Sequence, residues 1–349
     1  MAMQDILQYQ ERVTNALELY LKTLNQRDTS NKWYGDVILR LEQFSTSGKL
    51  LRGSLVCFMH DAFGGSHSEE AYRTAVVLEL VHSGLLIHDD IIDRDVLRRG
   101  RPAIHVQYQA LAKTSDAAHF GESMAICAAD TTYFLALEHL GELHIPPAQR
   151  HALYSLLNQV LATVCAGQML DIELGHSVGA VKKKDILTVM EQKTALYSVA
   201  LPLAAGALLA EQSAKTVDTI MKLGTLIGLI FQIRDDELAI FGDSRVTGKP
   251  VGSDIKEGKK TLLYYYLMRS STDSEKARLL QIFGNLTADP ADIDYVRQAM
   301  IRHKVPAIVK QEVESLTTRA AKLIGQVPLQ KSAQASLREL LDFCAKREV

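Results

Sequence analysis

The chain has 349 residues, 47% hydrophobic and 23% charged, so it can bury a sizeable core and does not have the composition of a disordered chain. Its formal net charge of −2 excludes a general affinity for nucleic acid, which needs a basic surface. The 4 cysteines form no CxxC pair, which predicts reduced thiols in a cytoplasmic protein.

The hydrophobic pattern predicts an all-α protein with a single domain over residues 1–349. Apolar residues recur at helical spacing, β-type alternation is nearly absent, and no linker rich in Pro, Gly or Ser divides the chain. In chain order, helices are predicted at 5–26, 31–45, 50–62, 69–93, 103–112, 117–140, 147–174, 183–210, 213–242, 259–269, 274–284, 290–303, 305–325 and 330–346.

Two segments bear on targeting and membranes. The N-terminal segment is amphipathic and mixes charges, so it is not expected to be a signal or transit peptide. Residues 194–210 carry no charge, but the stretch is short and contains Pro202. We therefore expect a buried helix there and no membrane span.

The predicted helix 69–93 ends in an acidic cluster, HSGLLIHDDIID. At about 100° per residue, Asp89 and Asp93 lie on one helix face, and His82 lies within about 20° of Asp89. Carboxylates one turn apart repel each other unless a cation lies between them. A solvated acidic helix end is the alternative, but the preceding apolar run, ELVHSGLLI, favours a buried helix whose end faces a cavity.

Local positive charge accompanies this cluster. It is found in RDVLRRGRP after the cluster, in GKLLR at 48–52, at Lys193 and in GKPVGSDIKEGKK. Arginines bind diphosphate oxygens in pairs and lysines supply a mobile charge, although each basic segment alone is also typical of a solvated loop. The glycine-rich segment 248–260 lacks the P-loop pattern, which excludes that kind of phosphate site.

The predicted helix 213–242 ends in a second acidic cluster, FQIRDDELAIFGD. Two acidic helix ends in one helical protein predict two walls of one site. Oxygen ligands select hard cations, and Mg²⁺ takes one or two carboxylates together with substrate phosphates and water. No His/Cys array suits zinc. The irregular stretch 243–258 that follows is long enough to be a functional or disordered loop.

In this order, the motifs resemble those of the trans-isoprenyl diphosphate synthase (polyprenyl synthetase) family through most of the chain. One position departs from the family pattern: Ala239 stands where the second DDxxD motif has its last Asp, and Gly242 is predicted to end the helix before Asp243. The matching residues are Gly48, Lys49 and Arg52, then His82, then Asp89, Asp90 and Asp93, then Arg98 and Arg99, then Gln168 and Asp171, then Lys193 and Thr194, then Phe231, Gln232, Asp235 and Asp236, and finally Lys249, Asp254 and Lys259.

The resemblance implies an isoprenoid-synthase-type helical bundle around a central cavity, with about three Mg²⁺ ions per site held through carboxylate oxygens. The substrates would be isopentenyl diphosphate and an allylic diphosphate, and the enzyme would be a homodimer. The implied metal ligands are Asp89, Asp93 and Asp235, supported by Asp90, Asp236, Gln168 and Asp171. Isopentenyl diphosphate is assigned to Lys49, Arg52, His82 and Arg99, the allylic diphosphate to Arg98, Lys193, Lys249 and Lys259, and stabilisation of the carbocation to Lys193, Thr194 and Gln232.

Helix geometry gives an expectation for the product. Each turn rises about 5.4 Å, roughly one isoprene unit, so Gly84 and Leu85, then Val81, mark successive depths below Asp89. The small residue at the first mark predicts an open channel and a geranylgeranyl product, with geranylfarnesyl or farnesyl as alternatives. Tyr133 and Phe134 are candidates to close the channel lower down, and Gly84 has the alternative role of letting a neighbouring helix approach closely.

Other classes of function remain open at this point. A terpene cyclase shares the helical fold and an aspartate-rich motif but needs no isopentenyl diphosphate site. A non-catalytic subunit of a heteromeric synthase is supported only by Ala239, and such subunits tend to lose the first acidic motif as well. A purely structural helical bundle would leave the ordered series of motifs unexplained.

Overall fold

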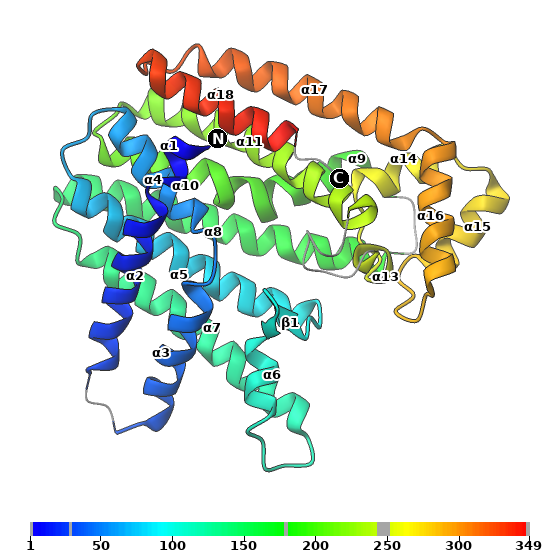
Figure 1. Ribbon diagram of the computed structural model, residues 1–349, viewed down its shortest axis with the longest axis horizontal. Coiled ribbons are helices and arrows are strands. Elements are labelled where there is room, and N and C mark those ends of the chain that lie inside the picture. Colours follow the sequence, from blue (N-terminus) through cyan, green and yellow to red (C-terminus); the bar gives the residue numbers. More distant parts are fainter. Residues whose placement is uncertain (1–2, 28–29, 178–180, 243–251, 347–349) are drawn as a thin grey trace. The chain divides into compact units, whose positions relative to one another are not determined.

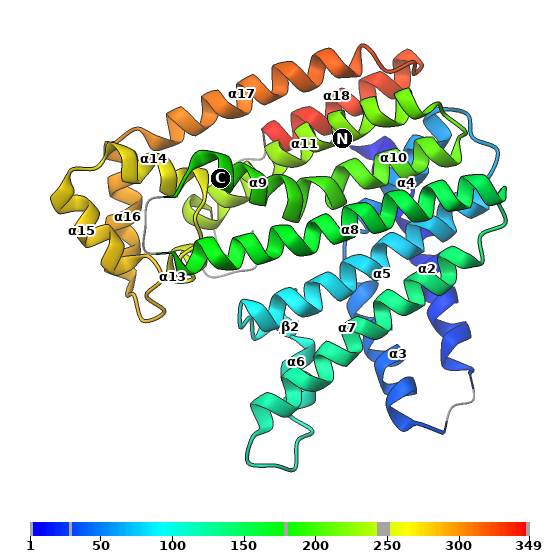
Figure 2. The same ribbon diagram turned by 180° about the vertical axis from the view of Figure 1, so that it is seen from behind.

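The structure is a computed structural model that describes residues 3–27, 30–177, 181–242 and 252–346 (Figures 1 and 2). Within these ranges the regular secondary structure is helical apart from two short strands, which confirms the predicted all-α class. The described chain divides into two compact units. The α5 unit comprises Gln4–Tyr154 and Pro202–Ser213, and the α11 unit consists mainly of Ser155–Leu201 and Ala214–Val349. The single domain over 1–349 stays a prediction.

The α5 unit is built around one long buried helix, α5 (Ser68–Ile92), which contacts α2, α3, α4, α6 and α7. Buried side chains occur on all sides of α5, as expected for a core helix. The elements of this unit are α1 (Gln4–Leu7), α2 (Gln10–Asn25), α3 (Lys32–Ser45), α4 (Leu51–Ala62), α5, β1 (Leu97–Arg98), β2 (Arg101–Pro102), α6 (Ile104–Gln109), α7 (Ala117–Gly141), the first residues of α8 (Pro147–His176) and most of α10 (Leu201–Leu209).

The α11 unit is built around α11 (Ala214–Phe241). This helix contacts the π-helix η1 (Met190–Ala200), and α17 and α18 lie along it (Figure 1). The remaining elements are α9 (Lys183–Val189), α13 (Ser253–Lys256), α14 (Leu262–Ser270), α15 (Asp273–Ile282), α16 (Pro290–Arg302), α17 (Val305–Ile324), α18 (Lys331–Ala345) and the main part of α8.

The predicted helix 183–210 is interrupted by η1, which hydrophobic periodicity did not reveal. Three helical glycines face its backbone and allow close contact. A Cβ at Gly167 would lie 2.7 Å from the backbone nitrogen of Lys193, one at Gly224 would lie 2.4 Å from Cα of Ala200, and one at Gly228 would lie 2.6 Å from Cα of Ala195. π-Helical turns are rare and occur mostly at functional sites.

Three further features differ from the sequence prediction. The predicted first helix is broken into α1 and α2, and the expected irregular stretch 243–258 contains α13. A two-residue hairpin joins β1 and β2 where no strand was predicted. Its central residues, Arg99 and Gly100, have φ of 54° and 74°, which is the backbone of a tight I′-type turn.

Among the residues that the structure describes, two helices are long and apolar enough to cross a membrane by length and composition alone. They are α8 and α11. Core helices of water-soluble proteins also meet this criterion of length and composition. Half of the apolar window of α11 is buried within the structure, which is typical of a core helix.

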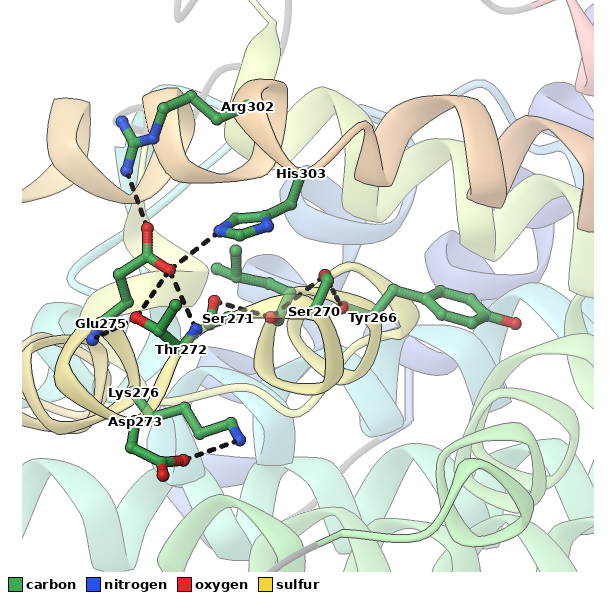
Figure 3. A network of polar contacts seen from close by, with 10 residues as sticks. Tyr266, Ser270, Ser271, Thr272, Asp273, Glu275, Lys276, Arg302 and His303 are labelled. Atoms are coloured by element: carbon green, nitrogen blue, oxygen red, sulfur yellow. Dashed lines mark hydrogen bonds and ion pairs between the residues drawn. The ribbon is translucent and has the colours of Figure 1, made fainter.

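The start of α15 is fixed by reciprocal hydrogen bonds (Figure 3). Thr272 Oγ1 accepts from the backbone N–H of Glu275 at 3.3 Å, and a Glu275 carboxylate oxygen accepts from the backbone N–H of Thr272 at 3.0 Å. His303 and Arg302, at the end of α16, also contact the Glu275 carboxylate, at 3.1 and 3.5 Å. This capping box therefore joins α15 to α16.

The cap predicts a pH-dependent contribution to stability. The Thr272 N–H and His303 hold the pKa of Glu275 at about 2, below its usual 4.5. Since the folded state favours the carboxylate, the stabilisation is present above pH 4.5 and is lost as the pH falls toward 2. We expect Glu275→Gln to lower the thermal midpoint at pH 7 and to flatten its acid dependence. An unchanged midpoint at every pH would contradict this role.

Candidate active site

The first acidic cluster lies at the C-terminal end of α5. Asp93 caps the helix, and its backbone N–H donates to the carbonyl of Asp89 at 2.8 Å, which confirms that the two residues lie one turn apart. The C-terminal end of a helix carries partial negative charge, so carboxylates there are unfavourable without a cation. Both side chains are half-buried, as ligands at the edge of a site must be.

The middle residue of the cluster, Asp90, faces inward and is bound by Arg98. Arg98 Nε donates to Asp90 Oδ1 at 2.7 Å, and Nη2 contacts the same oxygen. Nη2 also lies 3.1 Å from Asp95 Oδ2 and 4.0 Å from Asp89 Oδ2. Burial raises the pKa of Asp90 to about 6, against the opposing effect of Arg98. Arg98 thus keeps a buried carboxylate charged beside the predicted metal ligands.

The hairpin directs its two arginines to different partners. Arg98 binds Asp90, whereas Arg99 Nη1 donates to the Phe44 carbonyl and to Ser47 Oγ, both at 3.2 Å. A Cβ at Gly48 would lie 2.8 Å from Arg99 Nη2, so the glycine makes room for the guanidinium. The family resemblance implies separate roles for the two arginines, and the hairpin supplies the geometry that separates them.

Three of the four predicted isopentenyl diphosphate residues form one basic cluster on the α5 unit. The pKa of His82 lies well below its usual value because its ring is largely removed from water and because Arg52, Arg99 and Arg98 surround it with positive charge. The imidazole is therefore neutral at pH 7. The fourth residue, Lys49, is exposed and makes no ion pair with any residue in the described ranges.

The α11 unit brings together a second group of predicted residues. Lys193 Nζ, on η1, donates to Asp171 Oδ2 of α8 at 2.7 Å. Thr194 and Gln168 are half-buried on the same two helices. The predicted allylic site residue and its supporting acid are thus direct partners.

The second acidic cluster on α11 pairs an exposed with a buried carboxylate. Asp235 is exposed, while Asp236 is buried and accepts from Gln232 Nε2 at 2.7 Å. Burial, together with the nearby carboxylate of Asp254, raises the pKa of Asp236 well above its usual value. Lys259 Nζ lies 3.6 Å from Asp254 Oδ1 and offsets part of this negative charge.

The departure at Ala239 is clear in the structure. Helix α11 ends at Phe241, as predicted, and the carbonyl of Ala239 accepts from the backbone N–H of Gly252 at 3.1 Å. Asp243 and the predicted allylic ligand Lys249 lie outside the described residues. Whether the two acidic clusters form opposite walls of one cavity stays a prediction.

The first chain-length position is filled from a neighbouring helix. A Cβ at Gly84 would lie 2.7 Å from Cε1 of Tyr133 on α7, so the glycine allows this ring to lie against α5. This contact agrees with the alternative role of Gly84 in letting a neighbouring helix approach closely, and the part that Gly84 plays in product length stays a prediction. Val81 is buried and Leu85 half-buried, whereas Phe134 is 70% exposed and does not line the interior of the α5 unit.

Known proteins match this chain in both sequence and fold. The family model of polyprenyl synthetases matches residues 38–300. The chain belongs to the polyprenyl synthetase family. It is therefore a trans-isoprenyl diphosphate synthase, a prenyltransferase, as the order of motifs predicts.

Individual relatives of this synthase extend the match. The geranylgeranyl diphosphate synthase of Methanosarcina mazei is 36% identical, covering 68% of this chain and 67% of the relative. The geranylfarnesyl diphosphate synthase of Aeropyrum pernix is 30% identical, covering 88% and 92%. The solved structure of geranylgeranyl pyrophosphate synthase from Corynebacterium glutamicum, complexed with isoprenyl diphosphate and magnesium, has 29% identity and a TM-score of 0.90 over 97% of this chain and 99% of that chain.

Sequence reasoning missed two acidic residues near the basic groups of the synthase. Asp95 contributes to the Arg98 ion-pair network, and Glu79 is buried where the charges of Arg52 and Arg99 both lower its pKa against the effect of burial. Glu79 leaves a sequence signal, since it is the only Asp, Glu, Lys or Arg in the apolar run ELVHSGLLI, which contains His82 and precedes Asp89.

Proposed function

We propose that this synthase condenses isopentenyl diphosphate with an allylic diphosphate to give geranylgeranyl diphosphate, using Mg²⁺. The observation that carries the proposal is the clustering of Arg52, Arg99 and His82 on the α5 unit, whose central helix ends in Asp89 and Asp93. A terpene cyclase has no need of this second, metal-free anion site. The named relatives support geranylgeranyl diphosphate, with geranylfarnesyl diphosphate as the alternative product.

The carboxylates present suit magnesium. Among the side chains that the structure describes, no three His, Cys, Asp or Glu groups converge into a complete protein-only metal site. This suits Mg²⁺, which is usually held by one or two carboxylates plus substrate phosphates and water, and does not suit zinc. We assign Asp89, Asp93 and Asp235 as its ligands. When bound, Mg²⁺ supplies Lewis-acid stabilisation of the diphosphate leaving group.

Arg98 and His82 perform distinct tasks on the α5 unit. Arg98 binds Asp90 through Nε and Nη2, and its Nη1 has no acceptor in the described ranges, so Nη1 is placed to donate to the allylic diphosphate. His82 is neutral, so it can hydrogen-bond an anion without adding charge to the basic cluster. Arg52 and Arg99 then provide the charge that binds isopentenyl diphosphate.

On the α11 unit, we assign Lys193 to the allylic diphosphate and Thr194 and Gln232 to the carbocation. The Lys193–Asp171 ion pair holds the ammonium group in place. Oxygen atoms of η1 and of Gln232 would stabilise the positive charge that develops when the allylic C–O bond breaks. Lys249 and Lys259 are assigned to the same diphosphate by resemblance.

Product length gives a mutational test on α7. We expect Tyr133→Ala to lengthen the product, because removal of the ring that lies against Gly84 opens the first depth mark. Tyr295→Ala is the matched control, since this ring lies on α16 against Arg278 and not on α7. Chromatographic sizing of the dephosphorylated products measures both. Equal product distributions in wild type and Tyr133→Ala would show that the tail does not pass this position.

The proposed function itself is tested by incubating the purified protein with isopentenyl diphosphate, Mg²⁺ and dimethylallyl, geranyl or farnesyl diphosphate in turn. Geranylgeranyl diphosphate is expected as the final product from each allylic substrate. A longer main product would replace the product assignment, and a cyclic hydrocarbon formed without isopentenyl diphosphate would overturn the proposal.

The homodimer and the cytoplasmic location stay predictions. Support for the dimer comes from α7, where Phe134 is 70% exposed and Cys127, within about 20° of it around the helix, is exposed as well. A large exposed apolar ring is typical of a surface that a partner covers. Sedimentation velocity of the purified protein tests the dimer, and a single species with the mass of one chain would reject it.

A further inference from the structure

Glu79 is a buried carboxylate to which the proposed reaction gives no role. It lies on α5, one turn before His82, and is only 3% exposed. Burying a carboxylate is unfavourable unless hydrogen bonds and positive charge compensate. The compensation here comes from the residues that we assign to isopentenyl diphosphate.

The first partner of Glu79 is the N-terminus of α4. Leu50, the N-cap residue, has a left-handed backbone and offers no side-chain cap, so the first N–H groups of α4 need another acceptor. Glu79 Oε1 accepts from the backbone N–H of Gly53 at 2.8 Å, and the backbone of Arg52 donates to the same carboxylate. The positive end of the helix dipole favours an anion at this place.

The close approach depends on a glycine. A Cβ at Gly53 would lie 2.7 Å from Cγ1 of Val13 and 3.0 Å from Cβ of Ala75, so α4 can lie this close to α5 only with no side chain at residue 53. Glu79 therefore fixes the start of α4, and with it the backbone of Arg52, relative to His82 on α5.

The second compensation is the charge of two arginines. Burial raises the pKa of Glu79 above its usual value, and the positive charges of Arg52 and Arg99 oppose this shift. Arg52 in turn disfavours the charge of Arg99. Without an anion between them, two arginines held close together would turn apart. A substrate diphosphate is present only while it is bound, whereas the Glu79 carboxyl group is a permanent part of the cluster.

We propose that Glu79 is a positioning residue that holds Arg52 and Arg99 in place for isopentenyl diphosphate. It does so from inside the protein, as an acceptor at the N-terminus of α4 and as a counter-charge to both guanidinium groups. This inference rests on the proposed function, because it assumes that the basic cluster binds isopentenyl diphosphate.

The decisive variant is Glu79→Gln, which keeps the size of the side chain and can still accept from the Gly53 N–H. The change removes the carboxylate and places an amide N–H₂ group near the guanidinium groups of Arg52 and Arg99. We expect the KM for isopentenyl diphosphate to rise about tenfold, equivalent to about 1.4 kcal/mol, with the KM for geranyl diphosphate within about twofold of wild type. Calorimetric titration with isopentenyl diphosphate alone should show a matching rise in Kd.

Glu70→Gln is the matched control. Glu70 lies on the same helix, is buried, accepts from the backbone N–H of His144 at 3.0 Å and lies 3.8 Å from an arginine, Arg73. It therefore reproduces the loss of a buried charge at a place remote from the basic cluster. We expect it to lower the thermal midpoint without changing the KM or Kd for isopentenyl diphosphate.

The outcomes separate the inference from the proposed function. Wild-type protein that does not elongate allylic diphosphates would reject the proposed function. If the wild type is active, a Glu79→Gln enzyme with unchanged KM and Kd for isopentenyl diphosphate would reject the positioning role. Equal rises in KM for isopentenyl diphosphate and geranyl diphosphate in Glu79→Gln would show a general structural role and would also reject the positioning role. The same conclusion would follow if Glu70→Gln raised the KM for isopentenyl diphosphate as much as Glu79→Gln does.

Discussion

Replacing either Asp89 or Asp93 with alanine is expected to lower kcat roughly a hundredfold or more while the protein stays folded. The two carboxylates lie one turn apart at the C-terminal end of α5, where they repel each other and the helix dipole. Because both side chains are half-buried at the end of the helix and not in the core, their removal is expected to leave the protein folded, with a thermal midpoint in excess chelator close to that of the wild type.

Turnover with saturating substrates and thermal unfolding with excess chelator together test this prediction. Asp342→Asn is the control, because Asp342 is also a helical carboxylate but forms a surface pair with Lys346 at 2.8 Å on α18. It should leave kcat unchanged. Near-wild-type turnover in both Asp89→Ala and Asp93→Ala would exclude them as metal ligands.

Gly228→Ala is expected to lower both stability and turnover, because its one added carbon would lie 2.6 Å from Cα of Ala195 in η1. Backbone atoms cannot rotate away, so η1 or α11 must shift, at a cost of about 1–3 kcal/mol in the free energy of unfolding. Lys193 and Thr194 directly precede the contact. Since a displacement of about 1 Å can cost about a hundredfold in rate, kcat should fall well beyond what the stability loss explains.

Gly175→Ala, on α8, is the matched control. Nothing that the structure describes lies within 4 Å of a Cβ at Gly175, which is the last residue but one of α8, so alanine there should leave stability and kcat close to those of the wild type. Denaturant unfolding and kcat are measured for both variants at one temperature. If Gly228→Ala retains wild-type stability and kcat, the close packing of η1 is not required.

Most helices could be predicted because their apolar residues repeat at helical spacing. The predicted helix 69–93 differs from α5 by one residue at each end, and the predicted helix 117–140 differs from α7 by one residue at its C-terminal end. Periodicity describes one face of a helix and not its hydrogen-bond pattern, so η1 was predicted as ordinary helix. The β1–β2 hairpin has only two residues in each strand, too few to show alternation, and its Arg99-Gly100 turn reads as a basic loop.

The residues of the candidate site could be predicted, but several of their partners could not. Spacing placed Asp89 and Asp93 on one face, whereas only packing shows that Arg98 serves Asp90 and that Glu79 holds the start of α4. Gly84 illustrates the limit most clearly. A glycine in a sequence indicates space, but only the structure shows that the ring of Tyr133 fills it.

The measurement that tests the central claim most directly is diphosphate release from geranyl diphosphate in the presence of Mg²⁺, with and without isopentenyl diphosphate. A prenyltransferase with two diphosphate sites should release diphosphate only when isopentenyl diphosphate is present, at a rate equal to that of chain elongation. The Arg52→Ala enzyme should reach the wild-type rate of diphosphate release only at a higher isopentenyl diphosphate concentration, since the change removes charge from the second site alone. Equal release without isopentenyl diphosphate would contradict a condensing enzyme and would indicate a cyclase or hydrolase.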